Sequence, residues 1–413
     1  MSNSLHLGQF GFGCVGQGLY GVLQETNGIR AEYKKIVVKN RDKQRPIDAS
    51  NFGYTPADII DREDVNAVVE LIDTSEEAYE IVKSALKSGK SVVTANKKMV
   101  AEYYAELVDL QEETGQTLLY EASCAGSIPI IRNLEEYYDN DTLHGLEGIV
   151  NGTCTYILSK MLNEGVGYEP VLKEAQEKGF AESDPTLDVD GFDAKFKLVI
   201  LTGHAFGVFL KPEQVLNVGI RGVRAQDLQF AREKGYKVQL VATAKRIGDQ
   251  LVTFVLPQFV DDQHMLYNIT KEYNGIIVQA AFAEKQFFVG KGAGGYPTAS
   301  AVLSDISALT HGYKYEYKKK QQGLGIQFTT DVELPVYLRY AEDSDIEQRL
   351  GFTSIDSRFT SPNHNYLIGK VPLQNLLKNN AYLLENEVFV ALMPNATEKM
   401  VVTSGASQSL AAV

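Results

Sequence analysis

The sequence predicts an α/β protein with a parallel sheet in its first third, an α+β region after it and a small α+β region near the C-terminus. Three observations support this fold class. A glycine motif stands near the start, strand-like apolar runs alternate with amphipathic helical patterns to about residue 140, and strand-rich stretches follow. We expect domains over residues 1–140 and 141–312, and a third over 324–401 after a basic, tyrosine-rich linker at 313–320.

The glycine motif lies between an apolar stretch and a segment with apolar residues at helical spacing. A strand, a glycine turn and a helix in this order hold a pyrophosphate, because the helix N-terminus offers N–H donors and the positive end of its dipole. The first glycine makes the turn, the second lets the backbone approach the phosphates, and the third allows the helix to pack closely on the strand. The motif predicts cofactor contacts from Gly11, Phe12, Gly13, Val15 and Gly16.

The elements that follow keep the alternation of strands and helices. Buried strands are predicted at 35–38, 67–72, 91–94 and 117–120, with a helix at 75–88 that Ser75 caps. Later strands are predicted at 145–150, 251–255 and 276–280, and helices at 169–178 and 193–207. The last region predicts strand, helix, strand, strand, helix and strand, and we expect the final dozen residues to be disordered.

Composition excludes several functional classes. The net charge is −13 with no long basic run, so a nucleic-acid partner is not expected. No apolar run reaches the roughly 18 residues of a membrane span, and a cytoplasmic location is the expectation. The 3 cysteines and 6 histidines are scattered without metal-ligand spacing. A metal, if one is used, is therefore expected to be a hard cation held by oxygen.

Two strand ends carry more polar and small residues than packing requires. Lys97 follows the strand at 91–94, where an open α/β sheet places its ligands, although a solvated surface lysine is the alternative interpretation. Glu121 begins a run of small residues that ends near Pro129. A carboxylate with free backbone carbonyls suits a hard cation, and a turn of small residues selected for close packing is the alternative.

Two further segments are candidates for chemistry. The loop from Gly179 to Lys197 holds five carboxylates within twelve residues, and Asp193 lies one helical turn before Lys197. In a cleft, Asp193 would orient the ammonium of Lys197, and the other acids would suit an amine of the substrate; a solvated acidic loop is the alternative. The glycine-rich segment 290–300, which includes Gly294, predicts either a second phosphate-binding turn or a tight crossing of two backbones.

Taken together, these segments resemble homoserine dehydrogenase. The resemblance covers roughly residues 5–312 and rests on the glycine motif and on TANK, YEASCAGSIPII, NGTCTYIL, GFAESDPTLDVDGFDAKFK and GKGAGGYPTASAV. It implies oxidation of L-homoserine to L-aspartate 4-semialdehyde with NAD(P)+, or the reverse reaction, on the route to threonine, methionine and isoleucine. The chain is too short to include an aspartate kinase, so a monofunctional enzyme is implied.

The resemblance also assigns roles to residues. Lys197 matches the proposed proton donor, and Lys97 matches the second active-site lysine, which lies near the nicotinamide of the cofactor and the substrate oxygen. Glu182, Asp193 and Asp188 match groups that bind the substrate. Thr74 and Gly294 match positions near the cofactor. A sodium ion would be held by the Glu121 side chain and by backbone carbonyls of Cys124, Gly126 and Ile128, and a homodimer through the sheet of the second domain is the family expectation.

Cofactor choice and regulation are predicted less directly. The region after the second strand carries Lys39, Arg41 and Lys43 where an acidic residue would favour NAD, so we expect NADP, with Asp42 as the alternative that would favour NAD. Leu334–Tyr340 resembles the first strand of an ACT domain, but the loop at 341–345 lacks the expected glycine. A degenerate ACT-like region that serves dimer contacts is therefore predicted.

Other functions are compatible with parts of this pattern. An aspartate-semialdehyde or saccharopine-type dehydrogenase would share the nucleotide-binding half, and the former needs a thiolate, for which Cys124 and Cys154 lack an obvious histidine partner in sequence. A non-catalytic NAD(P)-binding sensor would be expected to have lost Lys97, Glu182, Asp193 or Lys197, and all four are present.

Overall fold

The computed structural model describes residues 4–26, 28–341, 345–362 and 364–403, which form two compact units. The first unit combines Met1–Asp139 with Gly203–Ala205 and Gly290–Gln321, and the second contains Asn140–Thr202, Phe206–Val289 and Gln322–Val413. No helix in the described part of the chain is long and apolar enough to cross a membrane. Of the final dozen residues that were predicted to be disordered, 404–413 lie outside the described residues, whereas Val402 pairs with Val332 in an antiparallel bridge.

The first unit is built on a six-stranded parallel sheet in the order β3-β2-β1-β4-β5-β6. This is the strand order of a doubly wound dinucleotide-binding domain, so the predicted fold class is confirmed. Its central strands are apolar on both faces, as strands covered by helices on both sides must be. Its elements are β1 (Leu5–Phe10), α1 (Cys14–Glu25), β2 (Ala31–Val37), β3 (Phe52–Gly53), α2 (Ala57–Ile60), β4 (Ala67–Glu70), α3 (Ser75–Lys87), β5 (Ser91–Thr94), α4 (Lys97–Glu102), α5 (Tyr104–Thr114), β6 (Leu118–Leu119), α6 (Ile130–Glu136), α12 (Gly295–Thr310) and α13 (Lys318–Gln321).

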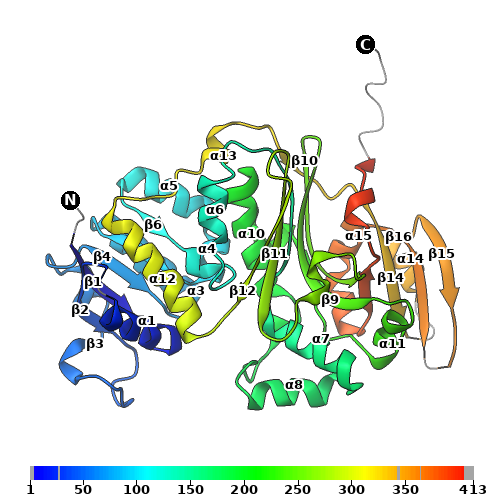
Figure 1. Cartoon of the computed structure of the whole chain (residues 1–413), viewed down its shortest axis with the longest axis horizontal. Coiled ribbons are helices and arrows are strands. Elements are labelled where there is room, and N and C mark those ends of the chain that lie inside the picture. Colours follow the sequence, from blue (N-terminus) through cyan, green and yellow to red (C-terminus); the bar gives the residue numbers. More distant parts are fainter. Residues whose placement is uncertain (1–3, 27, 342–344, 363, 404–413) are drawn as a thin grey trace, which may run out of the picture. The chain divides into compact units, whose positions relative to one another are not determined.

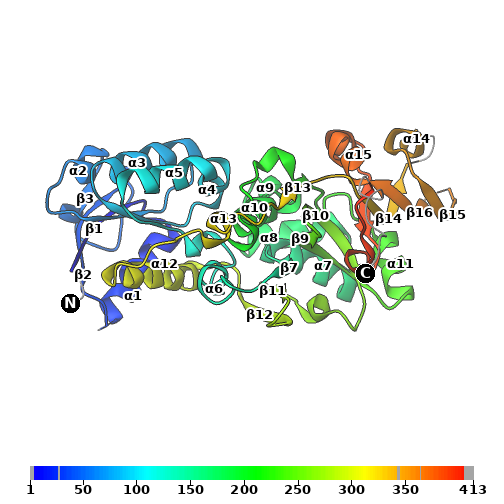
Figure 2. The same cartoon turned by 90° about the horizontal axis from the view of Figure 1, so that it is seen from above.

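Helix α12 returns to the first unit late in the chain and lies beside α1 in both Figure 1 and Figure 2. The contact is tight, because a Cβ on Gly18 would lie 2.7 Å from the carbonyl oxygen of Gly295. The sequence placed this helix in the second domain; the glycines at the crossing allow it to pack on the first instead. The segment expected to be a linker also belongs here, with Tyr315 and Tyr317 buried.

The second unit contains a mixed eleven-stranded sheet whose main path is β12-β11-β7-β9-β10-β17-β14-β16-β15. Strands β9 and β10 form a long antiparallel hairpin that turns at Gly248, where φ is +63°. The elements of this region are β7 (Leu143–Ile149), α7 (Gly152–Glu164), α8 (Tyr168–Glu177), α9 (Thr186–Val189), α10 (Phe192–Phe206), β8 (Leu216–Asn217), α11 (Ala225–Glu233), β9 (Lys237–Ile247), β10 (Gln250–Val260), β11 (Tyr273–Ala280), β12 (Lys285–Lys291), β13 (Gln327–Phe328), β14 (Glu333–Tyr340), α14 (Ile346–Leu350), β15 (Ser354–Phe359), β16 (Asn365–Pro372), α15 (Leu373–Lys378), α16 (Asn380–Glu385) and β17 (Phe389–Leu392).

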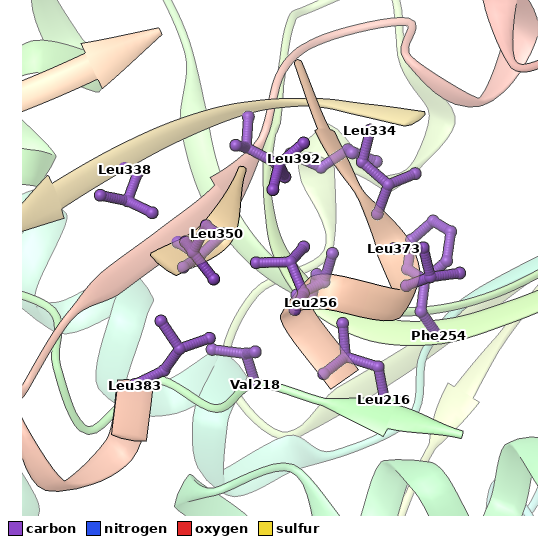
Figure 3. Packing of buried hydrophobic residues seen from close by; sticks show 14 of the residues in the cluster. Leu216, Val218, Phe254, Leu256, Leu334, Leu338, Leu350, Leu373, Leu383 and Leu392 are labelled. Carbon is purple, nitrogen blue, oxygen red and sulfur yellow. The ribbon is translucent and has the colours of Figure 1, made fainter. Parts of the chain in front are cut away.

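The C-terminal region shares its hydrophobic core with the strands that precede it. Figure 3 shows Leu216, Phe254 and Leu256 packed together with Leu334 and Leu392. Strand β10 also pairs in parallel with β17, which joins the two parts into one sheet. The order of elements from β14 to β17 agrees with the predicted order except that two helices, α15 and α16, stand where one was predicted. The ACT-like character of this region stays a prediction. Part of the loop at 341–345 lies outside the described residues.

Candidate active site

The glycine turn after β1 has the geometry that its three glycines predict. Gly11 has a φ of +89°, and a Cβ there would lie 2.4 Å from the carbonyl oxygen of Leu71. A Cβ on Gly13, the N-cap of α1, would meet no atom within 4 Å, so the backbone is open to a ligand at this point. A Cβ on Gly16 would lie 2.7 Å from Nε2 of Gln9 and would prevent the close packing of α1. The buried amide of Gln9 also donates to the Gly11 carbonyl oxygen (2.8 Å).

These glycines line a cavity of about 490 Å³ at the carboxyl ends of β1, β2 and β4. Of the residues predicted to bind the cofactor, the structure brings Gly11, Phe12, Gly13, Val15, Gly16 and Thr74 to this cavity. Lys97 and Gly294, which were also predicted to contact the cofactor, do not line it. The neighbouring Gly295 packs against α1, with its Cβ position 3.1 Å from Sγ of Cys14, which favours the interpretation of this segment as a tight backbone crossing. A cofactor role for Gly294 stays a prediction.

A basic loop after β2 forms one end of the cavity. Lys39 and Lys43 line it, as does Arg45, which sequence reasoning did not identify. The Arg45 guanidinium donates to the carbonyl oxygens of Lys43 and Asn40 (2.7 Å each) and lies over the ring of Phe52. Arg41 instead stacks on Tyr54, 4.5 Å from the ring centre. Two of the three predicted basic residues thus face the cavity.

Lys97 is the first residue of α4, directly beyond β5. Asn96 caps this helix by accepting from the backbone N–H of Met99 (3.0 Å). The Asn96 amide also donates to the carbonyl oxygen of Ile72 (3.1 Å), which lines the cavity. These bonds tie the loop that carries Lys97 to the edge of the cavity within the first unit.

Glu70 at the end of β4 is a buried residue that the sequence analysis did not single out. Its carboxyl accepts from the N–H of Ile72 (2.6 Å) and from the hydroxyl of Thr94 (2.5 Å), so it shapes the turn between β4 and Thr74. Burial raises the pKa of Glu70 to about 7. A carboxyl at the end of a buried strand was the available signal in the sequence.

The second unit brings Lys197 and Asp193 together on the first turns of α10. The buried Nζ of Lys197 donates to Oδ2 of Asp193 (2.7 Å) and to the carbonyl oxygen of Val150 (2.6 Å). Asn151 completes the arrangement, because its Nδ2 donates to Asp193 (2.9 Å) and to Oδ1 of Asp188 (2.7 Å). We call Asn151, Asp188, Asp193 and Lys197 the lysine–carboxylate cluster.

Asn151 is also the N-cap of α7, which fixes its position. Its Oδ1 accepts from the N–H of Cys154 (2.8 Å) and caps α7, so one amide both begins a helix and orients two carboxylates. Asn151 begins the segment NGTCTYIL, which carries part of the family resemblance, but the sequence predicted no role for its side chain. An asparagine before glycine at the end of a strand was the only local signal, and it is equally typical of a turn.

The remaining acids of the 179–197 loop do not join this cluster. Asp190 forms a two-point ion pair with Arg221 (2.8 and 2.9 Å), and Asp184 accepts from the N–H of Thr186 (3.1 Å). Both carboxylate oxygens of Asp190 accept from the guanidinium of Arg221, so this acid does not offer the substrate amine a free oxygen, and the expected amine-binding role is not carried over to Asp190. Glu182 is exposed, and its side chain is not part of the hydrogen-bonded cluster in the described residues.

The predicted cation segment adopts an unusual backbone. Ala125 and Gly126 both have positive φ values, +52° and +57°. The buried Glu121 carboxylate accepts from the N–H groups of Ile131 (2.9 Å) and Arg132 (2.8 Å), and burial raises its pKa to about 8. The region also packs closely, since a Cβ on Gly126 would lie 2.5 Å from the carbonyl oxygen of Lys291. Among the described residues, no group of three or more His, Cys, Asp or Glu could hold a metal ion.

The two buried thiols have no features of a nucleophile. Sγ of Cys154 donates to the carbonyl oxygen of Asp188 (3.2 Å), and burial next to Asp188 holds the pKa of this thiol well above its ordinary value. Cys124 is also buried, and its sulfur accepts from the hydroxyl of Ser123 (3.7 Å). A thiolate mechanism, which the aspartate-semialdehyde dehydrogenase alternative requires, thus lacks support in this geometry.

Comparison with known proteins finds matches to both parts of the chain. The family model for homoserine dehydrogenase matches residues 129–307, and the model for the homoserine dehydrogenase NAD binding domain matches residues 11–121. Homoserine dehydrogenase of Bacillus subtilis is 38% identical over 315 residues, which are 74% of this chain and 73% of that protein. The crystal structure of a homoserine dehydrogenase from Thiobacillus denitrificans has a TM-score of 0.82 at 30% identity and covers 95% of this chain and 98% of that one.

A hyperthermophilic archaeal homoserine dehydrogenase in complex with NADPH has a TM-score of 0.66 at 28% identity, over 76% of this chain and 99% of that one. The nucleotide-binding match ends before Ile128 and the second match begins at Pro129, so both halves of the predicted resemblance are present. The predicted family is confirmed by these matches and by the fold. The chain belongs to the homoserine dehydrogenase family of NAD(P)-dependent oxidoreductases.

Proposed function

We propose that Lys197 carries the proton in the interconversion of L-homoserine and L-aspartate 4-semialdehyde. The observation that supports this role is the position of its buried Nζ between Asp193 and the carbonyl oxygen of Val150, which fixes an ammonium group inside the acidic segment. In the reducing direction, the aldehyde carbon gains a hydride and its oxygen gains a proton from Lys197. In the oxidising direction, the alcohol O–H proton returns to the amine while the adjacent C–H bond breaks.

When bound, a nicotinamide cofactor would supply or accept the hydride. Lys197 stabilises the negative charge that develops on the substrate oxygen, and Lys97 is proposed as a second ammonium for the same oxygen. Asp188 and Asp193, held by Asn151, and the exposed Glu182 are proposed to bind the substrate amine. The proximity of Lys97 to this cluster is part of the proposal, because Lys97 belongs to the first unit and the cluster to the second.

The test compares Lys197→Met and Lys197→Arg with Lys195→Met. Lys195 is a second buried lysine of α10, stacked over Phe192, and is the matched control. NADPH oxidation at 340 nm with L-aspartate 4-semialdehyde should fall by about 10³-fold or more in both Lys197 variants and by less than about threefold in the control. The dissociation constant of NADPH should stay within about twofold of the unchanged protein. Full activity in both Lys197 variants would remove Lys197 from the mechanism.

The preferred cofactor is proposed to be NADP(H), with NAD(H) also accepted. Lys39, Lys43 and Arg45 at the end of the cavity support this, because they offer cations where a 2′-phosphate would need them. The NADPH complex of the archaeal relative is compatible with the same choice. The ratio of kcat/KM for NADPH to that for NADH is the measurement, and a ratio below one would contradict the proposal.

A sodium ion is proposed at the Glu121 carboxylate and the backbone carbonyls of Cys124, Gly126 and Ile128. The buried carboxylate and the paired left-handed residues suit such a site, while the close packing of Gly126 on residues 291–292 explains the same backbone without an ion. Thermal unfolding in sodium, potassium and a large organic cation at equal ionic strength distinguishes the two. A Tm that is independent of the cation would leave the packing explanation.

A homodimer through the sheet of the second unit is also proposed. Apolar side chains stand exposed on the β11–β12 hairpin: on the edge strand β12, Phe287 is 36% exposed and Val289 is 52% exposed, and Phe282 in the turn before it is 80% exposed. Exposed apolar residues that gather on one edge strand are typical of an interface. Sedimentation velocity at micromolar concentration is the test, and a monomer would contradict the proposal.

A further inference from the structure

An ion pair lies at the basic end of the cofactor cavity. Nζ of Lys39 donates to Oε2 of Glu77 at 2.7 Å, and the hydroxyl of Thr74 donates to the same oxygen at 2.9 Å. Both Lys39 and Glu77 line the cavity together with Gly11 and Gly13. The hydrogen bond from Lys39 holds the pKa of Glu77 below its ordinary value, so this carboxylate is ionised at neutral pH.

The Lys39–Glu77 ion pair lies where the adenosine ribose of the cofactor is expected. Lys39 stands two residues beyond the end of β2, and the loop after this strand faces the adenosine ribose in dinucleotide-binding sheets. Glu77 reaches the same place from the first turn of α3, across the cavity from β2. A carboxylate and an ammonium thus occupy the region where NADP(H) carries a phosphate and NAD(H) a hydroxyl.

We propose that Glu77 is a cofactor-specificity residue. It lowers the affinity of this enzyme for NADP(H) and so reduces the ratio by which NADP(H) is preferred over NAD(H). In the free protein it neutralises Lys39, the cation closest to the end of β2. A 2′-phosphate must therefore displace Glu77 from Lys39 and then lie close to a like charge. The neutral 2′-hydroxyl of NAD(H) meets no such repulsion.

The remaining basic residues fit this role for Glu77. The Arg45 guanidinium is fixed by two backbone carbonyls and by the ring of Phe52, so it faces the cavity without a carboxylate partner among the ion pairs of the described residues. Arg45 and Lys43 can attract a phosphate while Lys39 remains partly engaged. Arg45 and Lys43 therefore attract the 2′-phosphate while Glu77 repels it. Binding specificity often arises from such a combination of attractive and repulsive groups.

The size of the effect follows from exposure. The side chain of Glu77 is 42% exposed and that of Lys39 is 77% exposed, so water and salt screen the repulsion. Removing one charge from Glu77 should change the affinity for a phosphate dianion by about three- to tenfold at low ionic strength. The change should shrink to less than about twofold in 0.5 M salt, because the Debye length is then only about 4 Å.

The experiment measures binding in the absence of substrate, so its outcome does not depend on the role proposed for Lys197. Dissociation constants of NADPH, NADH and 2′,5′-ADP are determined by titration calorimetry for the unchanged enzyme, Glu77→Gln and Glu76→Gln. Glu76 lies next to Glu77 in the first turn of α3 but does not line the cavity, so it controls for the charge change alone. A glutamine at position 77 can still accept from Thr74, which preserves the local fold.

Glu77→Gln should bind NADPH and 2′,5′-ADP about three- to tenfold more tightly, with the affinity for NADH within about twofold of the unchanged enzyme. Glu76→Gln should leave the ratio of the NADH and NADPH dissociation constants unchanged. Lys39→Met should weaken NADPH binding by less than about threefold relative to the unchanged enzyme. In the Glu77→Gln background the same substitution should weaken NADPH binding by more than about threefold, relative to Glu77→Gln alone. Equal shifts for NADPH and NADH in Glu77→Gln, or no shift for either, would overturn the proposal.

Discussion

The cofactor cavity of the first unit and the lysine–carboxylate cluster of the second are built in different ways. The cavity is shaped by backbone, since Gly11 turns the chain and Gly13 leaves open space, and its charges stand on partly exposed side chains. In the cluster, Asp193 and Lys197 are buried and already hydrogen-bonded to each other and to Asn151. The cavity is thus suited to admitting and releasing a ligand, and the cluster to holding charged groups in one geometry.

The largest effect that would test this difference is expected at Asn151. Asn151→Ala removes two donors to carboxylates and the cap of α7, and Asn151→Asp keeps an acceptor for the cap but adds a third carboxylate. Both variants should lose about 10²-fold in kcat/KM, because Asp188 and Asp193 are no longer held in place. Only Asn151→Ala should also lose about 1 kcal/mol of stability, measured by urea unfolding. An active Asn151→Asp variant would show that the cluster does not need this donor.

A smaller effect is expected at two glycines of the cavity. Gly13→Ala adds a methyl group into open space, so the Tm should hardly change, while the dissociation constant of NADPH should rise by about tenfold because the backbone can no longer approach the phosphates. Gly16→Ala places a methyl group 2.7 Å from Gln9 and should lower stability by about 1–3 kcal/mol. Calorimetric binding and thermal unfolding of both variants are the measurements. The same response from both glycines would contradict the separate roles of phosphate approach at Gly13 and helix packing at Gly16.

A further effect, spread over about two pH units, is a pH dependence of stability that comes from Glu70. Its pKa is about 7 in the folded protein, above the ordinary value of 4.5, because the carboxyl is buried. Between about pH 5 and 7 the unfolded chain loses this proton while the folded protein keeps it, so the free energy of unfolding falls as pH rises, by at most about 3 kcal/mol. Glu70→Gln should flatten the slope of the urea midpoint over this window, and the exposed Glu80→Gln should leave it unchanged. An unaltered slope in Glu70→Gln would assign the pH dependence to other groups.

The cofactor cavity was largely predictable because its residues are close in sequence. The turn from Gly11 to Gly16 is one continuous motif, and its neighbours Lys39 and Thr74 follow strands whose apolar character is evident. Arg45 was missed because it lies beyond the loop positions that an extended β2 would place near a ribose. It reaches the cavity through hydrogen bonds to the carbonyls of Asn40 and Lys43, which no pattern of residue types encodes.

The cluster was predictable only in part, for a physical reason. Asp193 and Lys197 were found because they lie one turn apart on a helix, whereas Asn151 meets Asp193 across a separation of 42 residues. The same holds for α12 and for Tyr315, whose burial in the first unit depends on contacts with distant segments. The segment 313–320 was predicted to be a linker because of its lysines at 318–320. Composition alone does not indicate that the rings of Tyr315 and Tyr317 in this segment are buried.

The late return of α12 to α1 has a consequence for how the chain is synthesised. The first unit requires residues 290–321, so its packing is incomplete when residue 139 has been made. At about 5–20 residues per second, roughly ten to forty seconds separate the two events on the ribosome. During this interval the surface of α1 around Gly18 lacks the cover that Gly295 later provides. The first unit therefore completes its packing only after residues 140–202 and 206–289 of the second unit have been synthesised.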